Sequence, residues 1–165
     1  PRAAQIQRDF SGDREELTLS YQTVGTVRNP LGPTVSIYED LRAHQDSHRR
    51  AELEARSCLS GPHKDDLAAW IDGQPARQFA SQGQTRTAAL SLKLAERELF
   101  EDDTGQWPVL LLDDVLSELD SSRQKYLLDG IHDIQTLITC TGLDEFVENR
   151  FEINKVFRVS DGVVT

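Results

Sequence analysis

The chain has 165 residues, and its 18 basic and 28 acidic side chains give a formal net charge of −10. This length allows one ordinary domain, or one domain plus an appendage. No apolar run approaches the roughly 18 residues of a membrane-spanning helix. Residues 101–165 carry 14 acidic and 5 basic side chains. The negative net charge therefore argues against a chain that binds nucleic-acid phosphates by itself, although residues 1–100 could carry a local basic patch.

The chain contains no methionine and only two cysteines. Because a complete protein starts with methionine, we expect either that the start was processed or that this chain is a piece of a longer one. Cys58 and Cys140 could form one disulfide, but two distant cysteines without metal-like spacing favour a reducing, cytoplasmic location.

The first half of the chain predicts few regular elements. Residues 1–16 lack a period and indicate an irregular lead-in, and residues 17–21 alternate as in a strand. Glycines and prolines predict a loop over 25–33, and a charged helix is expected over 37–55. A hairpin is expected from strands 67–71 and 77–80, joined at Asp72-Gly73.

The second half alternates strands and helices. A polar loop over 81–84 precedes a strongly periodic helix over 85–100. Residues 109–112 form a continuous apolar run, which is typical of a strand buried on both faces. Asp120 is placed to cap a helix that runs to 131, and a strand is expected over 136–140. This order indicates a βαβ unit in an α/β fold, followed by a hairpin over 155–159 and 163–164.

Two acids, Asp113 and Asp114, follow the apolar run directly. The carboxyl edge of a parallel sheet is where α/β proteins bind ligands. There the first carboxylate can hold Mg²⁺ and the second can orient or deprotonate an attacking water. The alternative is a plain acidic turn after a strand.

The loop Ser81-Gln82-Gly83-Gln84 stands at a helix N-terminus, where free backbone N–H groups favour an anion such as a terminal phosphate. Ser81 could instead serve only as a helix cap.

Three segments together, residues 61–67, 79–95 and 110–120, resemble the RecF family of bacterial DNA replication and repair proteins, within the SMC branch of the ABC-type ATPases. The close resemblance covers residues 57–140. It implies a partial P-loop NTPase fold, the signature and Walker B half of an ABC-type ATPase head. Residues 1–57 would be the end of a helical insertion domain, and residues 58–165 the carboxyl-terminal half of the head.

The resemblance also implies residue roles. Asp113 would contact Mg²⁺, and Asp114 would be the catalytic carboxylate, where many ABC ATPases have Glu. The signature residues Ser81, Gln82, Gly83 and Gln84 would meet the γ-phosphate of ATP held by the other subunit of a homodimer. Asp120 would line the same interface, and Thr141 stands where most ABC ATPases keep a switch histidine.

The function implied by the family is ATP-dependent dimerisation on DNA, at single-strand/double-strand junctions, with slow hydrolysis. It also implies work with RecO and RecR in recombinational repair, replication restart and the SOS response. No Walker A sequence occurs in the chain, so we expect little ATP binding or turnover by this chain alone.

Two other functions stay open at this point. The chain could be the head of another SMC-like ATPase. It could also be mainly a protein-docking module that meets a basic partner through its acidic tail, with Glu145, Glu148 and Glu152 as the residues to test.

Two groups of polar residues have weaker functional interpretations. His44 and His48 lie one helical turn apart and could ligate a metal, but no other ligand cluster is near. Arg49, Arg50, Arg56 and Lys64 could touch DNA phosphates. Because Glu52 and Glu54 interleave them, a solvated face with internal ion pairs is the better interpretation.

Overall fold

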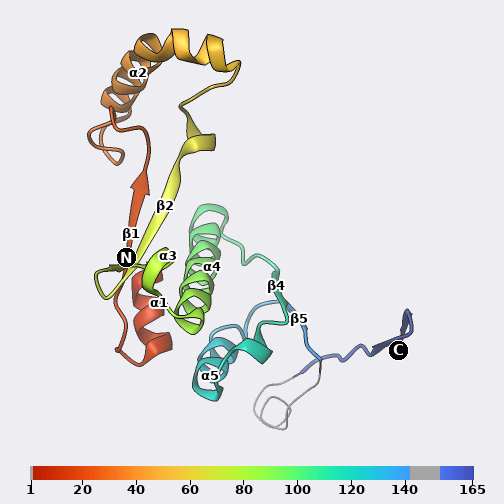
Figure 1. The fold of residues 1–165 in the computed structure, drawn as a ribbon. Coiled ribbons are helices and arrows are strands. Elements are labelled where there is room, and N and C mark those ends of the chain that lie inside the picture. Colours follow the sequence, from red (N-terminus) through yellow and green to blue (C-terminus); the bar gives the residue numbers. More distant parts are fainter. Residues whose placement is uncertain (1, 142–152) are drawn as a thin grey trace. The chain divides into compact units, whose positions relative to one another are not determined.

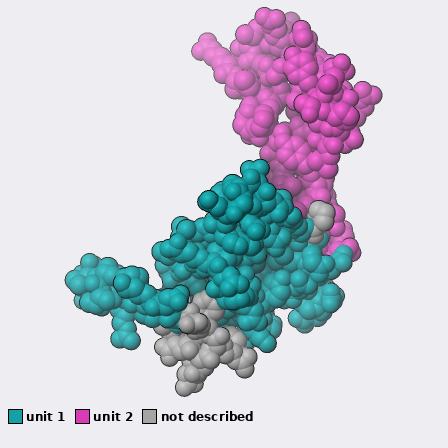
Figure 2. All heavy atoms as spheres, turned by 180° about the vertical axis from the view of Figure 1, so that it is seen from behind, with its two compact units in different colours: residues 1–15, 82–165 teal, residues 16–81 magenta. Residues whose placement is uncertain are grey.

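The structure, a computed structural model, describes residues 2–141 and 153–165. The chain divides into two compact units (Figure 2): unit 1 comprises residues 1–15 and 82–165, and unit 2 comprises residues 16–81. The domain boundary expected between residues 57 and 58 lies inside unit 2 and stays a prediction. No helix in the described part of the chain is long and apolar enough to cross a membrane.

Unit 1 begins with helix α1 (Arg2–Ser11), so the prediction of an irregular lead-in is wrong. Its buried apolar residues are Ala3, Ile6 and Phe10. The stripe is hard to see in the sequence because Gln7, on the same face, is polar yet fully buried. The Gln7 side-chain carbonyl accepts a hydrogen bond of 2.9 Å from the Ser91 hydroxyl, which satisfies part of that amide inside the core.

Helix α4 (Gln82–Thr104) packs against α1 (Figure 1). Its buried residues are Thr87, Ala88, Ser91, Leu94 and Ala95. The helix is confirmed but begins at Gln82, three residues before the predicted start, and ends at Thr104. Helix α5 (Ser121–Asp129) also packs on α1, where the rings of Phe10 and Tyr126 lie 4.6 Å apart.

The predicted βαβ unit is confirmed. Strands β4 (Leu110–Asp113) and β5 (Thr136–Thr139) pair in parallel, with Leu110 opposite Thr136 and Asp113 opposite Thr139. The connection between them contains the 3₁₀ turn η2 (Leu116–Glu118) and α5. The acids that follow the apolar run therefore lie at the carboxyl edge of a parallel pair, as predicted.

The prediction that strand β4 is buried on both faces is wrong for one of the two faces. Leu112 is buried, but Leu111 is 71% exposed and its partner Leu137 is 54% exposed. Side chains alternate along a strand, so these two leucines share one face, and no described element covers it. Strand β4 is thus apolar on both faces, but within the described residues only one face is covered.

Unit 2 contains an antiparallel sheet of β1 (Leu17–Gln22), β2 (Asp66–Ile71) and β3 (Gln74–Pro75). The turn at Asp72-Gly73 is confirmed, with positive φ angles of 51° and 74° at its two residues. The return strand predicted over 77–80 is wrong: pairing ends at Pro75, which has no N–H to donate, and helix α3 (Ala76–Phe79) follows.

The long charged helix of unit 2 is confirmed as α2 (Thr34–Ala55). His44 is the one residue of this helix that is buried, which agrees with its sparse apolar pattern. The 3₁₀ turn η1 (Pro62–Lys64) leads from it towards β2. At the end of the chain, β6 (Val159–Ser160) and β7 (Val163–Val164) form the predicted hairpin, shorter than expected.

Candidate functional site

Asp113 is the last residue of strand β4 and Asp114 follows it directly; both residues, hereafter the acidic edge, are exposed. Thr139, opposite Asp113 on β5, contacts both residues. Its hydroxyl donates a hydrogen bond to Asp113 Oδ1 and accepts one of 3.0 Å from the Asp114 backbone N–H. The Thr139 carbonyl also accepts from that N–H, at 3.1 Å. The acidic edge is therefore anchored to the neighbouring strand by one threonine.

Asp114 has a left-handed backbone, with φ of 51°. This conformation turns the chain sharply out of the strand, and it is uncommon for a residue other than glycine. The Ser117 hydroxyl lies 2.9 Å from both the Asp114 carbonyl oxygen and Oδ1, and it can donate to either. The carboxylate of Asp114 is thus held in one orientation while it stays open to solvent.

Asp120 is the N-cap of α5, as predicted. Its Oδ1 accepts hydrogen bonds from the backbone N–H groups of Ser122 (3.1 Å) and Arg123 (3.0 Å), and from the Ser122 hydroxyl (2.6 Å). The Ser122 hydroxyl, followed by the Arg123 backbone N–H, lowers the pKa of Asp120 below its usual range. The segment 117–120, hereafter the D-loop-like segment, therefore ends in a firmly ionised carboxylate.

The four residues 81–84, hereafter the signature segment, are not a loop throughout. Gln82, Gly83 and Gln84 form the first turn of α4, and only Ser81 precedes the helix. The prediction of a polar loop over 81–84 is therefore wrong for three of its residues, because the helical hydrogen bonds start earlier than expected. The Thr87 hydroxyl also donates a hydrogen bond to the Gly83 carbonyl at 2.8 Å. A first turn still presents backbone N–H groups without intrahelical acceptors, which suits an anion.

The structure joins the predicted residues in two groups within unit 1. Asp113 and Asp114 share Thr139 as a partner. Gly83 and Asp120 both lie near Arg123, whose guanidinium contacts the Asp120 carboxylate and would lie 3.8 Å from a Cβ built on Gly83. Thr141 is exposed just beyond β5 and belongs to neither group.

Sequence reasoning missed several residues that connect this site. They are Thr139, Ser117, Arg86, Glu118, Arg123 and Glu15. Arg86 and Glu118 form an ion pair of 2.7 Å between α4 and the D-loop-like segment. The sequence signal available for this pair was a basic residue two positions after the signature segment and an acidic residue in the D-loop-like segment.

The acidic edge provides hard oxygen ligands of the kind that Mg²⁺ prefers. Proteins usually hold Mg²⁺ through one or two carboxylates together with substrate phosphates, rather than through a full protein cage. Within residues 2–141 and 153–165, no group of three or more His, Cys, Asp or Glu side chains is arranged to hold a metal ion. The carboxylates of Asp113 and Asp114 have the chemistry that would hold a Mg²⁺ ion shared with a nucleotide.

The two histidines of α2 have other partners. Their rings stack with centroids 4.0 Å apart, and His48 Nδ1 lies 3.0 Å from the His44 carbonyl oxygen. Asp40, one turn earlier, pairs with Arg28 at 3.4 Å. On the same helix, Arg50 pairs with Glu54 at 2.9 Å, which agrees with an ion-paired solvated face.

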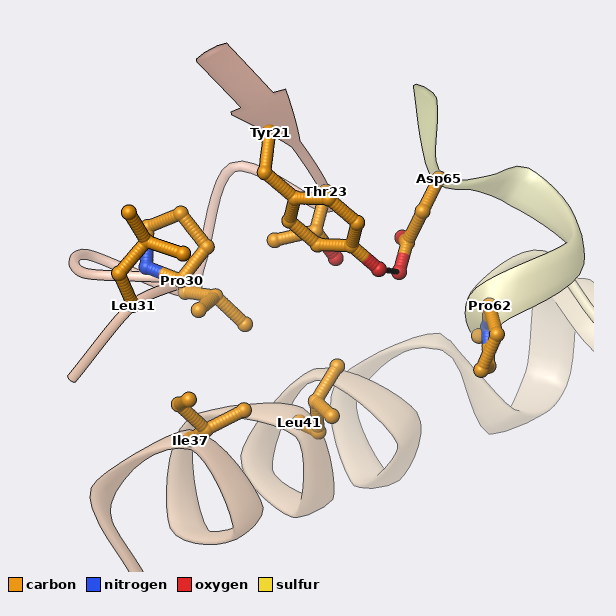
Figure 3. Close-up of a pocket in the computed structure, with 10 residues that line it drawn as sticks. Tyr21, Thr23, Pro30, Leu31, Ile37, Leu41, Pro62 and Asp65 are labelled. Atoms are coloured by element: carbon orange, nitrogen blue, oxygen red, sulfur yellow. Dashed lines mark hydrogen bonds between the residues drawn. The ribbon is translucent and has the colours of Figure 1, made fainter. Parts of the chain in front are cut away.

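Unit 2 also contains a pocket of about 320 Å³ beside α2 (Figure 3). Apolar side chains line most of it, and Tyr21 and Asp65 meet at its rim, where the tyrosine hydroxyl donates to Asp65 Oδ2. This hydrogen bond raises the pKa of Tyr21 and lowers the pKa of Asp65. Neither group belongs to the acidic edge or to the signature segment.

Comparison with known proteins identifies relatives along nearly the whole chain. No family model matches it. The "DNA replication and repair protein RecF" of Agathobacter rectalis is 47% identical over 163 residues, covering 96% of this chain and 41% of the relative. The protein of that name from Clostridium tetani is 41% identical over 157 residues, covering 95% and 42%.

A solved structure agrees with these relatives. The chain matches "recombination mediator protein RecF-ATP in RecFOR pathway" with a TM-score of 0.78 and 34% sequence identity, over 99% of this chain and 42% of that one. The chain thus spans about two fifths of the length of the relatives that it matches.

Proposed function

This chain corresponds to the carboxyl-terminal portion of RecF proteins, and from this premise we propose that it supplies the hydrolytic half of an ATP-dependent DNA-binding protein. In this role Asp113 holds Mg²⁺, and Asp114 orients and deprotonates the attacking water. The observation that carries the proposal is the shared Thr139 hydroxyl, which fixes the Asp113 carboxylate and the Asp114 backbone at the edge of a parallel strand pair.

The signature and D-loop-like segments act on the ATP of a second subunit. Ser81, Gln82, Gly83 and Gln84 meet the γ-phosphate through backbone N–H groups and the dipole of α4. Asp120 and Thr141 lie along the same dimer interface. Mg²⁺, when bound, neutralises the charge that develops on the phosphates. The sequence has no Walker A segment, so another part of the longer protein would cradle the β- and γ-phosphates.

The longer protein acts on DNA at single-strand/double-strand junctions, in recombinational repair and replication restart, with RecO- and RecR-type mediators as partners. The names of the matching relatives and of the solved structure support the role in replication, repair and a recombination-mediator pathway. The acidic residues proposed for mediator docking, Glu145, Glu148 and Glu152, lie outside the described residues. The head of another SMC-like ATPase is disfavoured by the relatives' shared name.

The test is a full-length protein with Asp114→Asn. Loss of the base should abolish most ATP hydrolysis while ATP binding stays near that of the wild type. Asp133→Asn, an exposed acid away from the edge, is the matched control and should hydrolyse ATP normally. Wild-type hydrolysis by Asp114→Asn would overturn the proposed role.

A further inference from the structure

Arg123, in the first turn of α5, is a largely buried cation between two carboxylates. Its side chain is 18% exposed. One terminal nitrogen lies 3.0 Å from Asp120 Oδ2, and the other lies 3.5 Å from Glu15 Oε1. Burying a charge is costly unless it is paired, and the planar fork of arginine can meet two carboxylates at once, whereas lysine is a point charge.

Glu15 is an unusual partner because it comes from the other end of unit 1. Its side chain is 12% exposed, and its Oε2 accepts a hydrogen bond of 2.6 Å from the Gln7 amide. Gln7 is fully buried against α4. The carboxylate of Glu15 is therefore held in place before it meets Arg123, and it fixes the guanidinium relative to α1 and α4.

The same guanidinium lies near Gly83 of the signature segment. A Cβ built on Gly83 would lie 3.8 Å from an Arg123 terminal nitrogen. Arg123 thus lies beside the first turn of α4 and contacts the D-loop-like carboxylate of Asp120. The Arg86–Glu118 ion pair of 2.7 Å also links α4 to the D-loop-like segment.

We propose that Arg123 is a positioning residue that locks Gly83 and Asp120 into one rigid surface, so that both approach the ATP of the second subunit together. This inference rests on the proposed function. A misplacement of about 1 Å can lower a rate by about a hundredfold, so a residue that fixes two nucleotide-facing elements should affect turnover strongly without contacting ATP.

The experiment uses the full-length protein with Arg123→Gln, and Lys125→Gln as control, since Lys125 is exposed on the same helix. Arg123→Gln should lower kcat about tenfold to a hundredfold with little change in ATP affinity. Without nucleotide, hydrogen exchange of the signature and D-loop-like segments should accelerate in Arg123→Gln and not in Lys125→Gln. Unchanged kcat or unchanged exchange in Arg123→Gln would overturn the inference.

Glu15→Gln provides a second variant if Arg123→Gln folds poorly. It keeps the shape and the acceptor for Gln7 but removes the charge that holds the guanidinium, so kcat should fall in the same direction. A normal kcat and normal exchange in Glu15→Gln would count against the inference. Asp114→Asn separates the two proposals: if it loses hydrolysis while Arg123→Gln keeps it, only this inference fails.

Discussion

The Thr139 hydroxyl on β5 donates a hydrogen bond to the Asp113 carboxylate on β4. The same oxygen accepts from the Asp114 backbone N–H at 3.0 Å. A single side chain on the neighbouring strand therefore orients the carboxylate proposed to hold Mg²⁺ and the backbone of the carboxylate proposed to activate water. Register alone makes this arrangement, because Asp113 and Thr139 are paired across the two strands.

Thr139→Val keeps the shape of the side chain and removes the hydroxyl. Asp113 loses a donor and the Asp114 N–H loses one of its two acceptors, so we expect ATP hydrolysis by the full-length protein to fall about tenfold or more. Thr139→Ser should restore most of the rate. Thr136→Val, at the opposite end of β5, is the control and should leave hydrolysis unchanged. Equal rates in Thr139→Val and Thr136→Val would contradict the role given to the hydroxyl.

Gly83→Ala separates folding from nucleotide contact. The added Cβ would have only the Arg123 side chain within 4 Å, at 3.8 Å, and alanine is the better helix former by up to about 1 kcal/mol. We therefore expect a melting temperature equal to or above that of the wild type, but a lower rate of hydrolysis because the proposed function brings the phosphate close to the backbone of this turn, where glycine has no side chain. Loss of both stability and activity would instead mean that Gly83 is required for packing.

The sequence predicted the elements that carry strong local signals. The helix over 85–100, the Asp120 cap and the parallel strand pair all rest on periodicity, capping chemistry or continuous apolar runs, and all are present. The fold class followed from their order. The residue types at the acidic edge also predict a ligand site, and this stays a prediction.

The failures have identifiable physical causes. Helix α1 was missed because Gln7 is buried in its apolar stripe and is satisfied by Ser91, a partner 84 residues away. The return strand after Asp72-Gly73 was overpredicted because Pro75 ends the pairing. Arg123 and Thr139 were missed because their roles depend on tertiary partners, Glu15 and Asp113, that no local pattern can reveal.

Because Asp120 caps α5 as an ionised carboxylate, we expect the stability of the folded protein to depend on pH. Because the pKa of Asp120 is lowered in the folded protein, its ionised form is stabilising above the usual carboxyl pKa of about 3.9, and this contribution is lost as pH falls through the folded value. Asp120→Ala should lower the free energy of unfolding at pH 7 by about 1 kcal/mol. Urea unfolding from pH 7 to pH 2 should show this difference shrinking below about pH 4. A difference independent of pH would refute the ionised cap.

At alkaline pH we expect the opposite trend, because the stabilising contribution of Tyr126 is lost as pH rises. Burial, followed by its hydrogen bond of 3.1 Å to Asp9, raises the pKa of Tyr126 from 10.0 to about 12. Its contribution to stability is therefore complete below pH 10 and is lost as pH rises towards 12. Tyr126→Phe should remove this part of the alkaline loss, at a cost of about 1 kcal/mol at pH 7. Tyr38→Phe, an exposed tyrosine, is the control, and equal alkaline profiles for the two variants would argue against the assignment.

The central claim is that the acidic edge of one subunit and the signature segment of another form one ATP site. Two full-length variants test it together: Asp114→Asn, which removes the proposed base, and Ser81→Arg, which places a bulky cation on an exposed residue of the signature segment. Each should be inactive alone. In a mixed dimer, the intact acidic edge of the Ser81→Arg subunit faces the intact signature segment of the Asp114→Asn subunit.

Hydrolysis by an equimolar mixture of these two variants is the most direct measurement. Random association makes half of the dimers mixed, each with one intact site, so the mixture should recover roughly a quarter of the wild-type rate. Mixing either variant with itself should recover nothing. A mixture as inactive as its components would contradict an ATP site shared between two subunits.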